Sequence, residues 1–242
     1  YQSAVAADAM KKHEDEKPKN APKKDCGFIT IAAGEGLAEI FKGLGVDEVI
    51  QGGQTMNPST EDILNAADKI NADTIFVLPN NSNIILASNQ AASIIDDKKL
   101  VVIPTKTIPQ GITAMINFEL TRSADENEKA MLESLSTVKS GQLTYAVRDT
   151  SIDGKEIKKD NYLGLGDKGL ASVGTDMDDT LIDMLSEFVD DESELISVYY
   201  GEDIDENKAE ELVYKIEEKF DGVDVELQYG GQPVYYYIVS VE

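Results

Sequence analysis

Short runs of apolar residues alternate with amphipathic segments from residue 27 to about residue 139. Each apolar run has the length of one strand, and the segments between the runs are patterned as helices. Continuous apolar strands that alternate with helices are typical of a parallel sheet covered on both faces. We therefore predict an α/β lobe over residues 26–139. Its strands are expected at 28–31, 48–50, 74–78 and 100–103, and its helices at 37–42, 61–70, 82–95, after Pro109-Gln110-Gly111, and at 124–138.

The pattern changes after residue 140. Residues 142–152 alternate apolar and polar positions, and Asp153-Gly154 is a strong signal for a hairpin turn into a partner strand at 155–163. Farther along we expect a helix at 177–188, a strand at 195–199, a helix at 207–219, and strands at 223–228 and 234–241. Residues 140–242 are therefore predicted to form a second lobe with a mixed sheet.

The first 25 residues have a different character. The stretch KKHEDEKPKNAPKK (11–24) is charged, contains proline and has no apolar periodicity, which indicates a linker. The chain starts at Tyr1 rather than at Met, so we expect it to be part of a longer protein. We expect Glu242 to be its natural C-terminus.

Composition excludes several classes of function. The net charge of −24 and the pI near 4.3 make nucleic acid and anionic lipid poor partners, because like charges repel. An acidic surface can also do no more than keep a protein soluble. With only Cys26 and His13, no intrachain disulfide and no His/Cys metal cluster can form, which fits the cytoplasm. The uncharged run 74–95 carries Pro79-Asn80-Asn81-Ser82-Asn83 at its centre, so we do not expect it to span a membrane.

Polar residues gather where the predicted parallel strands end, at the edge where such sheets bind ligands. Asn, Ser, Thr and Gly are favoured both in turns and at helix caps. Ser59 with Asp62 resembles a capping box. Both interpretations stay open: caps alone, or a crevice for an oxyanion or a partner's carbonyl groups. The candidates are Gly34, Glu35, Gly36, Gln54, Thr55, Asn57, Ser59, Asn80, Asn81, Ser82, Asn83, Thr105, Thr107 and Gln110.

Catalytic motifs do not emerge from the sequence. It has no GxxxxGK[ST] loop and no GxSxG elbow. Glu39 stands where a dinucleotide fingerprint needs its third glycine. Asp176, Asp178 and Asp179 lie at the predicted start of a helix. The helix dipole favours acidic residues there, so a metal site is not needed to explain them. We therefore predict no catalytic residue and no metal ligand in this chain.

The segment Gly230 to Tyr237 is a further candidate contact surface. Three consecutive tyrosines on a predicted strand would point to both faces, so at least one is expected at the surface or at the lobe boundary. Tyrosine is frequent at protein interfaces. We single out Gly231, Gln232 and Tyr235 as candidates for partner contact.

Four segments together resemble one family. GGQTMNPSTEDIL (52–64), VLPNNSNIILASNQA (77–91), VVIPTKTIPQGITAM (101–115) and GGQPVYYYIVSVE (230–242) are similar to the C-terminal region of the large, ATP-binding subunit of bacterial fatty acid kinase. That family is also described as dihydroxyacetone-kinase or Dak-phosphatase-like. The resemblance covers nearly the whole chain from residue 27.

The resemblance implies a fold and a role. The fold would be the two-lobed fold of DegV-like fatty-acid-binding proteins. In the family, ATP and Mg²⁺ bind an N-terminal domain, and a middle domain carries metal ligands; neither cofactor is expected here. The C-terminal region would help dock the DegV-like small subunit, which presents an acyl carboxylate for phosphorylation and so feeds phospholipid synthesis.

Two hypotheses of different classes follow. In the first, this chain is a non-catalytic docking module of a kinase, and it acts by positioning its partner. In the second, the crevice at the strand ends binds a fatty acid or a small anion directly. An apolar tunnel under the strand ends would favour the second hypothesis, and a filled core would favour the first.

Overall fold

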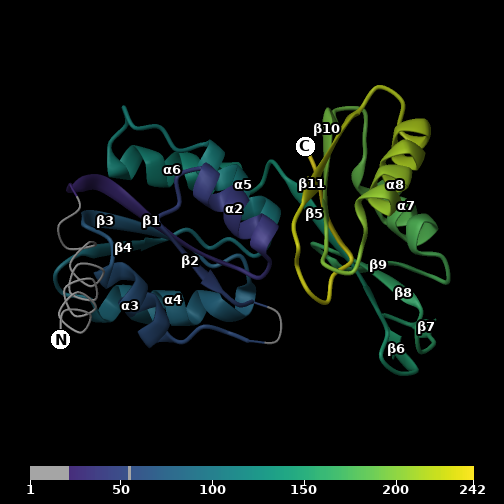
Figure 1. The fold of residues 1–242 in the computed structure, drawn as a ribbon, viewed down its shortest axis with the longest axis horizontal. Helices are drawn as coiled ribbons and strands as arrows, with labels where there is room; N and C mark the ends of the chain where they lie inside the picture. Colours follow the sequence, from purple (N-terminus) through teal and green to yellow (C-terminus); the bar gives the residue numbers. More distant parts are fainter. Residues whose placement is uncertain (1–21, 54–55) are drawn as a thin grey trace, which may run out of the picture.

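Two lobes lie side by side in the computed structural model, which describes residues 22–53 and 56–242 (Figure 1). The first lobe is built on a four-stranded sheet in the order β2-β1-β3-β4, and all its strands are parallel. This arrangement is the predicted parallel α/β lobe. The strands are β1 (Lys24–Ala32), β2 (Glu48–Gln51), β3 (Ala72–Leu78) and β4 (Lys99–Val102).

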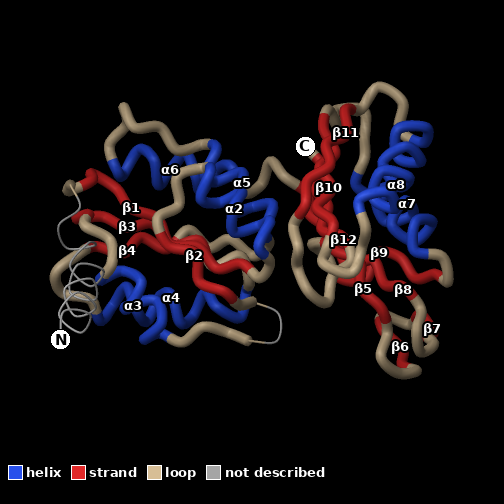
Figure 2. The backbone as a smooth tube through the Cα atoms, viewed as in Figure 1, coloured by secondary structure: helices blue, strands red, loops and turns tan. Residues whose placement is uncertain are grey.

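Helices cover both faces of this sheet (Figure 2). One face packs against α2 (Glu35–Gly43), α5 (Ile108–Ile116) and α6 (Ala124–Ser134). The other face packs against α3 (Thr60–Asp68) and α4 (Ser82–Ile94). Side chains alternate along β1, so that Phe28 and Ile29 enter different cores. The ring of Phe28 lies 5.6 Å from that of Phe76 and 4.7 Å from that of Phe118.

The second lobe is built on a mixed six-stranded sheet in the order β11-β10-β12-β5-β8-β9. Only β10 and β11 are parallel neighbours. The strands are β5 (Lys139–Tyr145), β8 (Tyr162–Gly166), β9 (Gly169–Gly174), β10 (Leu195–Tyr200), β11 (Asp224–Tyr229) and β12 (Tyr237–Val241), and helices α7 (Met177–Phe188) and α8 (Glu206–Lys219) cover one face.

Helix α7 lies directly on this sheet because three sheet positions are glycine. A Cβ on Gly141 would lie 2.8 Å from the sulfur of Met184, and a Cβ on Gly166 would lie 2.5 Å from the ring of Phe188. A Cβ on Gly164 would overlap the hydroxyl of Ser172 and lie 3.1 Å from Met184. The space between α7 and the sheet is therefore filled by side chains of the helix.

The opposite face of the second sheet is turned toward the first lobe. Tyr199 and Ile238 project from this face into the core that contains α2 and α5. The amide of Leu37 in the first turn of α2 donates a 2.9 Å hydrogen bond to the carbonyl of Gly230. The hydroxyl of Thr113 on α5 donates a 2.8 Å hydrogen bond to the carboxylate of Glu242. The two lobes thus share apolar and polar contacts.

Two helix boundaries were predicted wrongly. Pro109-Gln110-Gly111 lies inside α5, which begins at Ile108, because proline is well suited to the first turn of a helix. Helix α6 ends at Ser134 instead of residue 138. The hydroxyls of Ser134 and Thr137 bond to backbone carbonyls three residues earlier, which competes with helix continuation.

The strands predicted at 142–152 and 155–163 pair in the register of the predicted hairpin, but the pairing is interrupted between its two ends. The turn at Asp153-Gly154 is present, but it joins the short strands β6 (Thr150–Ile152) and β7 (Lys155–Ile157), which form a separate two-stranded sheet. This hairpin extends from the end of the second lobe (Figure 1). Farther from the turn, β5 pairs with β8, so that Tyr145 lies opposite Tyr162; β5 also pairs with β12, and β9 was not predicted.

The last strand is shorter than predicted, because it begins at Tyr237 rather than Val234. Val234 has a φ of 70°, which breaks an extended strand, and Pro233 has no amide hydrogen to donate. Tyr235 and Tyr236 therefore lie in a loop, and the prediction that the three tyrosines share one strand is wrong.

The chain is already part of the first sheet at Lys24, inside the predicted linker 1–25. Lys24 also forms an ion pair with Asp47. Residues 1–21 lie outside the described part of the chain. Within the described ranges, the structure has no helix with the length and apolarity needed to cross a membrane.

Candidate functional site

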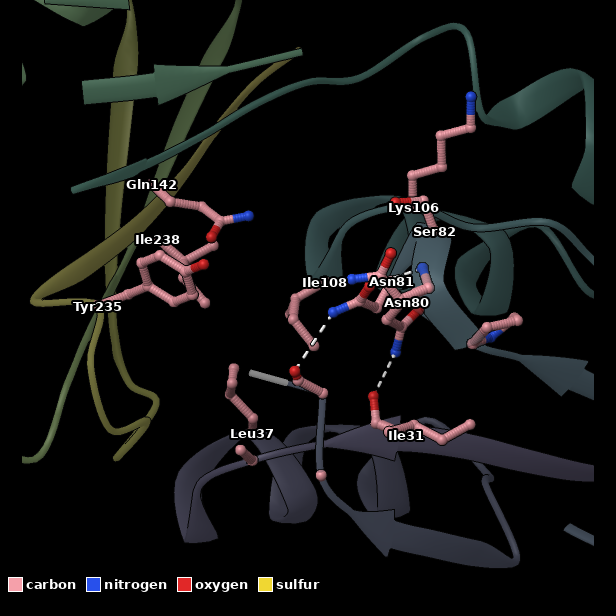
Figure 3. Close-up of a pocket in the computed structure, with 15 residues that line it drawn as sticks. Ile31, Leu37, Asn80, Asn81, Ser82, Lys106, Ile108, Gln142, Tyr235 and Ile238 are labelled. Atoms are coloured by element: carbon pink, nitrogen blue, oxygen red, sulfur yellow. Dashed lines mark hydrogen bonds between the residues drawn. The ribbon is translucent and has the colours of Figure 1, made fainter. Parts of the chain in front are cut away.

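A pocket of about 270 Å³ opens between the lobes, where the parallel strands of the first sheet end (Figure 3). The topology explains its position, because the carboxyl ends of parallel strands meet at one edge. Of the polar candidates predicted at the strand ends, Asn80, Asn81, Ser82 and Asn83 line it, and the second lobe closes it. Its lining is Ile31, Ala33, Leu37, Gly52, Gly53, Pro79, Asn80, Asn81, Ser82, Asn83, Lys106, Ile108, Gln142, Tyr235 and Ile238.

Asn80 is the centre of a buried hydrogen-bond network. Its side-chain amide donates to the hydroxyl of Thr30 at 2.7 Å and to the carbonyl of Ile31 at 3.0 Å. Its side-chain oxygen accepts a 2.9 Å hydrogen bond from the hydroxyl of Thr105. The same hydroxyl accepts a hydrogen bond from the backbone amide of Asn80. A Cβ on Gly111 would overlap the Asn80 amide. Both predicted candidates, Asn80 and Thr105, therefore connect β1, β3 and α5, and their polar groups bond within the protein.

Asn81 caps helix α4. Its side-chain oxygen accepts the amide of Asn83 at 2.9 Å, and its amide donates to the carbonyl of Gly53 at 3.2 Å. The side chains of Ser82 and Asn83 are exposed beside it. Ser82 and Asn83 are therefore the two predicted candidates of this loop that face solvent at the pocket.

Thr107 and Gln110 hold the next loop in place. The hydroxyl of Thr107 lies 2.8 Å from that of Ser140 in β5 and accepts the amide of Gln110. The side chain of Gln110 accepts the amide of Lys106 at 2.7 Å and donates to Leu135 at 3.3 Å. These two candidates join α5 to its neighbours and do not line the pocket.

Gly34, Glu35 and Gly36 lie at the lobe junction. A Cβ on Gly36 would overlap the carbonyl oxygen of Tyr229, and a Cβ on Gly34 would overlap that of Gly230. Glu35 is exposed in the first turn of α2. The N-terminus of α2 therefore receives a carbonyl group of the second lobe.

The segment that follows β11 completes this junction. Gln232 is buried and donates a 3.0 Å hydrogen bond to the carbonyl of Tyr199, and Gly231 adopts a φ of 68°. Tyr235 reaches the pocket from the second lobe, and partial burial raises the pKa of its hydroxyl. At this point the loop, rather than a strand, places a tyrosine at the lobe boundary (Figure 3).

The loop between β2 and α3 contributes less than predicted. Ser59 caps α3 through a reciprocal capping box with Asp62, and Asn57 is exposed and does not line the pocket. Gln54 and Thr55, also predicted as candidates, lie outside the described residues.

Sequence reasoning missed Lys106 and Gln142. Gln142 lies on β5, and its neighbour Leu143 enters the core under α7 and α8, so alternation directs Gln142 toward the first lobe. The alternation was visible in the sequence, but the position of the first lobe was not. Lys106 extends away from the Asn80 and Asn81 amides (Figure 3).

The pocket offers groups that bind rather than groups that react. Its described lining contains amides, hydroxyls and one lysine, without a nucleophile beside a general base. Asp176 caps α7 through the amide of Asp179, and Asp178 is paired with Lys215 at 2.8 Å. Across the described ranges, no three His, Cys, Asp or Glu residues are grouped as metal ligands. Burial, with the charge of Asp25, raises the pKa of Cys26.

Comparison of the sequence with known proteins identifies a family and a relative that match this chain. The profile of the FakA-like C-terminal family of fatty acid kinases matches residues 27–242. The chain is 44% identical over 240 residues to the protein YloV of Bacillus subtilis. This alignment covers 99% of the chain and 43% of YloV, so the chain spans less than half of that relative.

DegV family proteins are among the solved structures that superimpose on this chain. A DegV family protein of Corynebacterium glutamicum superimposes with a TM-score of 0.66 at 12% identity, over 90% of this chain and 97% of that chain. The fatty acid kinase B3 protein of Streptococcus pneumoniae, solved with linoleic acid, superimposes with a TM-score of 0.60 at 12% identity, over 90% and 99%. The predicted two-lobed DegV-like fold is therefore confirmed.

Proposed function

Because this chain belongs to the FakA-like C-terminal family of fatty acid kinases, we propose that it is a docking module. It binds a DegV-like, fatty-acid-binding small subunit and holds that subunit for phosphorylation of its acyl carboxylate. ATP and Mg²⁺ bind elsewhere in the kinase, and the reaction takes place in the cytoplasm. The contribution of this chain is positioning, which lowers the entropic cost of bringing two reacting groups together.

One observation carries the proposal: the interior that an acyl chain would need is filled by the protein's own side chains. Met184 and Phe188 lie against the glycines of the second sheet, and Tyr237 is fully buried in the same core. On the other side of the junction, Asn80 and Thr105 use their polar groups within the protein. A filled interior favours binding through the outer surface.

The direct test is binding between the purified chain and the DegV-like protein of the same organism. Isothermal titration calorimetry at low salt should show a saturable complex, and its affinity should fall as salt is added because the chain carries a net charge of −24. Hen lysozyme, a basic protein, serves as the control for nonspecific attraction. Equal affinity for both proteins, or no complex with either, contradicts docking.

A second function is favoured by the pocket itself. Ser82 and Asn83 at the start of α4 leave room for a small anion, since helix N-termini attract negative charge. A volume of about 270 Å³ with polar walls suits a head group rather than a long acyl chain. Native mass spectrometry with excess fatty acid tests this function. A bound mass that disappears in Asn83→Ala supports it, and an unshifted protein excludes it.

A further inference from the structure

The seam between helices α7 and α8 runs over the middle of the second sheet. Both helices lie on the same face of this sheet (Figure 2). Helix α8 packs on β10 and β11, and helix α7 packs on β5, β8 and β9. Strand β12 lies between β10 and β5 in the sheet order. Side chains of β12 that point to the helix side therefore enter the space where the two helices meet.

Tyr237 brings a hydroxyl into this seam. It is the first residue of β12, and its ring is fully buried in the core that contains Leu181 of α7 and Leu212 of α8. Its neighbours across the sheet are Tyr200 and Leu143. The hydroxyl of a buried tyrosine normally has a hydrogen-bond partner, because leaving it unpaired costs free energy.

An ion pair crosses the same seam. Asp178 lies in the first turn of α7, and one oxygen of its carboxylate is 2.8 Å from the ammonium of Lys215 on α8. Asp178 is only 7% exposed, whereas half of the Lys215 side chain is exposed. The carboxylate therefore lies at the edge of the core, and the lysine reaches it from the solvent side.

Two oxygen atoms at this seam lack a hydrogen-bond partner among the described residues. They are the second carboxylate oxygen of Asp178 and the hydroxyl oxygen of Tyr237, and both are buried. A carboxylate accepts hydrogen bonds through both of its oxygens. Burying one of them unpaired is costly, so the two atoms together indicate a site for a small molecule that bonds to both.

The hydroxyl of Tyr237 stays protonated in this position. Burial raises its pKa, and the charges of Asp178, Asp205 and Glu211 raise it further. A protonated hydroxyl can donate one hydrogen bond and can also accept, whereas the carboxylate can only accept. The ligand must therefore donate to Asp178, and it can accept from Tyr237. Water has this pattern of donors and acceptors.

Charge and space disfavour other ligands. The ammonium of Lys215 already neutralises Asp178, so a cation gains little, and an anion would meet a carboxylate. The surrounding core is filled by apolar side chains such as Leu181, Ile204 and Leu212, so the ligand must be small. A buried water needs at least two polar partners, and this site offers them.

We propose that one ordered water molecule binds between Asp178 and Tyr237 at the seam of α7 and α8. The water donates a hydrogen bond to the free carboxylate oxygen of Asp178 and accepts one from the hydroxyl of Tyr237. Together with the ion pair to Lys215, it connects α7 and α8 to β12, the strand between the strands that each helix covers. The site is separate from the inter-lobe pocket and does not depend on the proposed docking function.

A high-resolution crystal structure of the purified chain tests the site directly. One water should lie within hydrogen-bond distance of both oxygens, and it should be lost or displaced in Tyr237→Phe. Direct contact between the hydroxyl of Tyr237 and the carboxylate of Asp178 would contradict the proposal. Two buried oxygens with no water between them would contradict it as well.

Urea denaturation tests the same site in solution. Tyr237→Phe removes only the hydroxyl, so the bound water loses one of its two partners, and the equilibrium constant for unfolding should rise about tenfold. Tyr145→Phe, which removes a hydroxyl at an exposed position, is the matched control and should change this constant by less than about twofold. If the hydroxyl of Tyr237 has no partner, its removal leaves the protein equally stable or more stable, and the proposal is wrong.

A double-mutant cycle shows whether one water joins the two groups. Asp178→Asn and Tyr237→Phe should each destabilise the chain, and their combined effect on the unfolding constant should be smaller than the product of the two single effects. Asp178→Asn combined with Tyr145→Phe should give the simple product. If the first pair also gives the simple product, Asp178 and Tyr237 do not share a ligand, and the bridge is excluded.

Discussion

The loops at the strand ends of the first lobe and the outer face of α8 are both rich in polar residues, but their partners differ. Asn80, Thr105 and Gln110 bond to neighbouring elements within the protein. Glu210 and Glu217 on α8 point into solvent. Polar groups that already have partners stabilise the fold, and exposed charged groups contribute little to its stability. The two regions should therefore respond differently to substitution: the first should lose stability, and the second should change little.

The largest loss of stability is expected at the lobe junction. In Gly36→Ala the new Cβ overlaps the backbone of Tyr229, so α2 and β11 must move apart and the hydrogen bond from Leu37 to Gly230 is lost. Overpacking against backbone on both sides should lower the free energy of unfolding by about 3 kcal/mol. Urea denaturation measures it. Gly43→Ala, whose Cβ would meet nothing within 4 Å, is the matched control and should change little.

The next effect is expected from Asn80→Ala. The substitution removes the side-chain bonds to Thr30, Ile31 and Thr105 and leaves the buried hydroxyl proton of Thr105 without its acceptor. A loss of about 2–3 kcal/mol in the free energy of unfolding follows from the cost of unsatisfied buried groups. Asn83→Ala, at an exposed position of the same loop, should cost below about 0.5 kcal/mol. Equal small effects at both positions would show that the Asn80 network does not hold the first lobe.

A smaller effect on stability is expected at high pH, when a tyrosine buried at the lobe junction ionises. Burial raises the pKa of Tyr199 to about 12, because the neutral hydroxyl is favoured in the folded state. Its contribution to stability is complete below pH 10, the ordinary value, and is lost as the pH rises toward 12. The unchanged chain should lose about 2 kcal/mol more than Tyr199→Phe over this window. Parallel stability curves for the two proteins would contradict the burial of this hydroxyl at the junction.

The alternation of short apolar runs with helices determined the first lobe. The runs at 74–78 and 100–103 became β3 and β4, and Ser59 with Asp62 formed the predicted capping box. These features depend on residues close in sequence, so periodicity and cap chemistry are sufficient to predict them. The helices at Met177 and Glu206 follow for the same reason.

Only the tertiary structure decided how the polar loops are used. The sequence places Asn80 after a strand, but the contact with Thr30, fifty residues away, decides that its amide is buried and bonded. The same holds for Gly36, whose role depends on the approach of Tyr229 from the other lobe. The pairing of β12 with β5, about a hundred residues apart, also depends on distant partners. Long-range contacts override local propensity there, because burial and hydrogen bonding contribute more free energy than intrinsic preference.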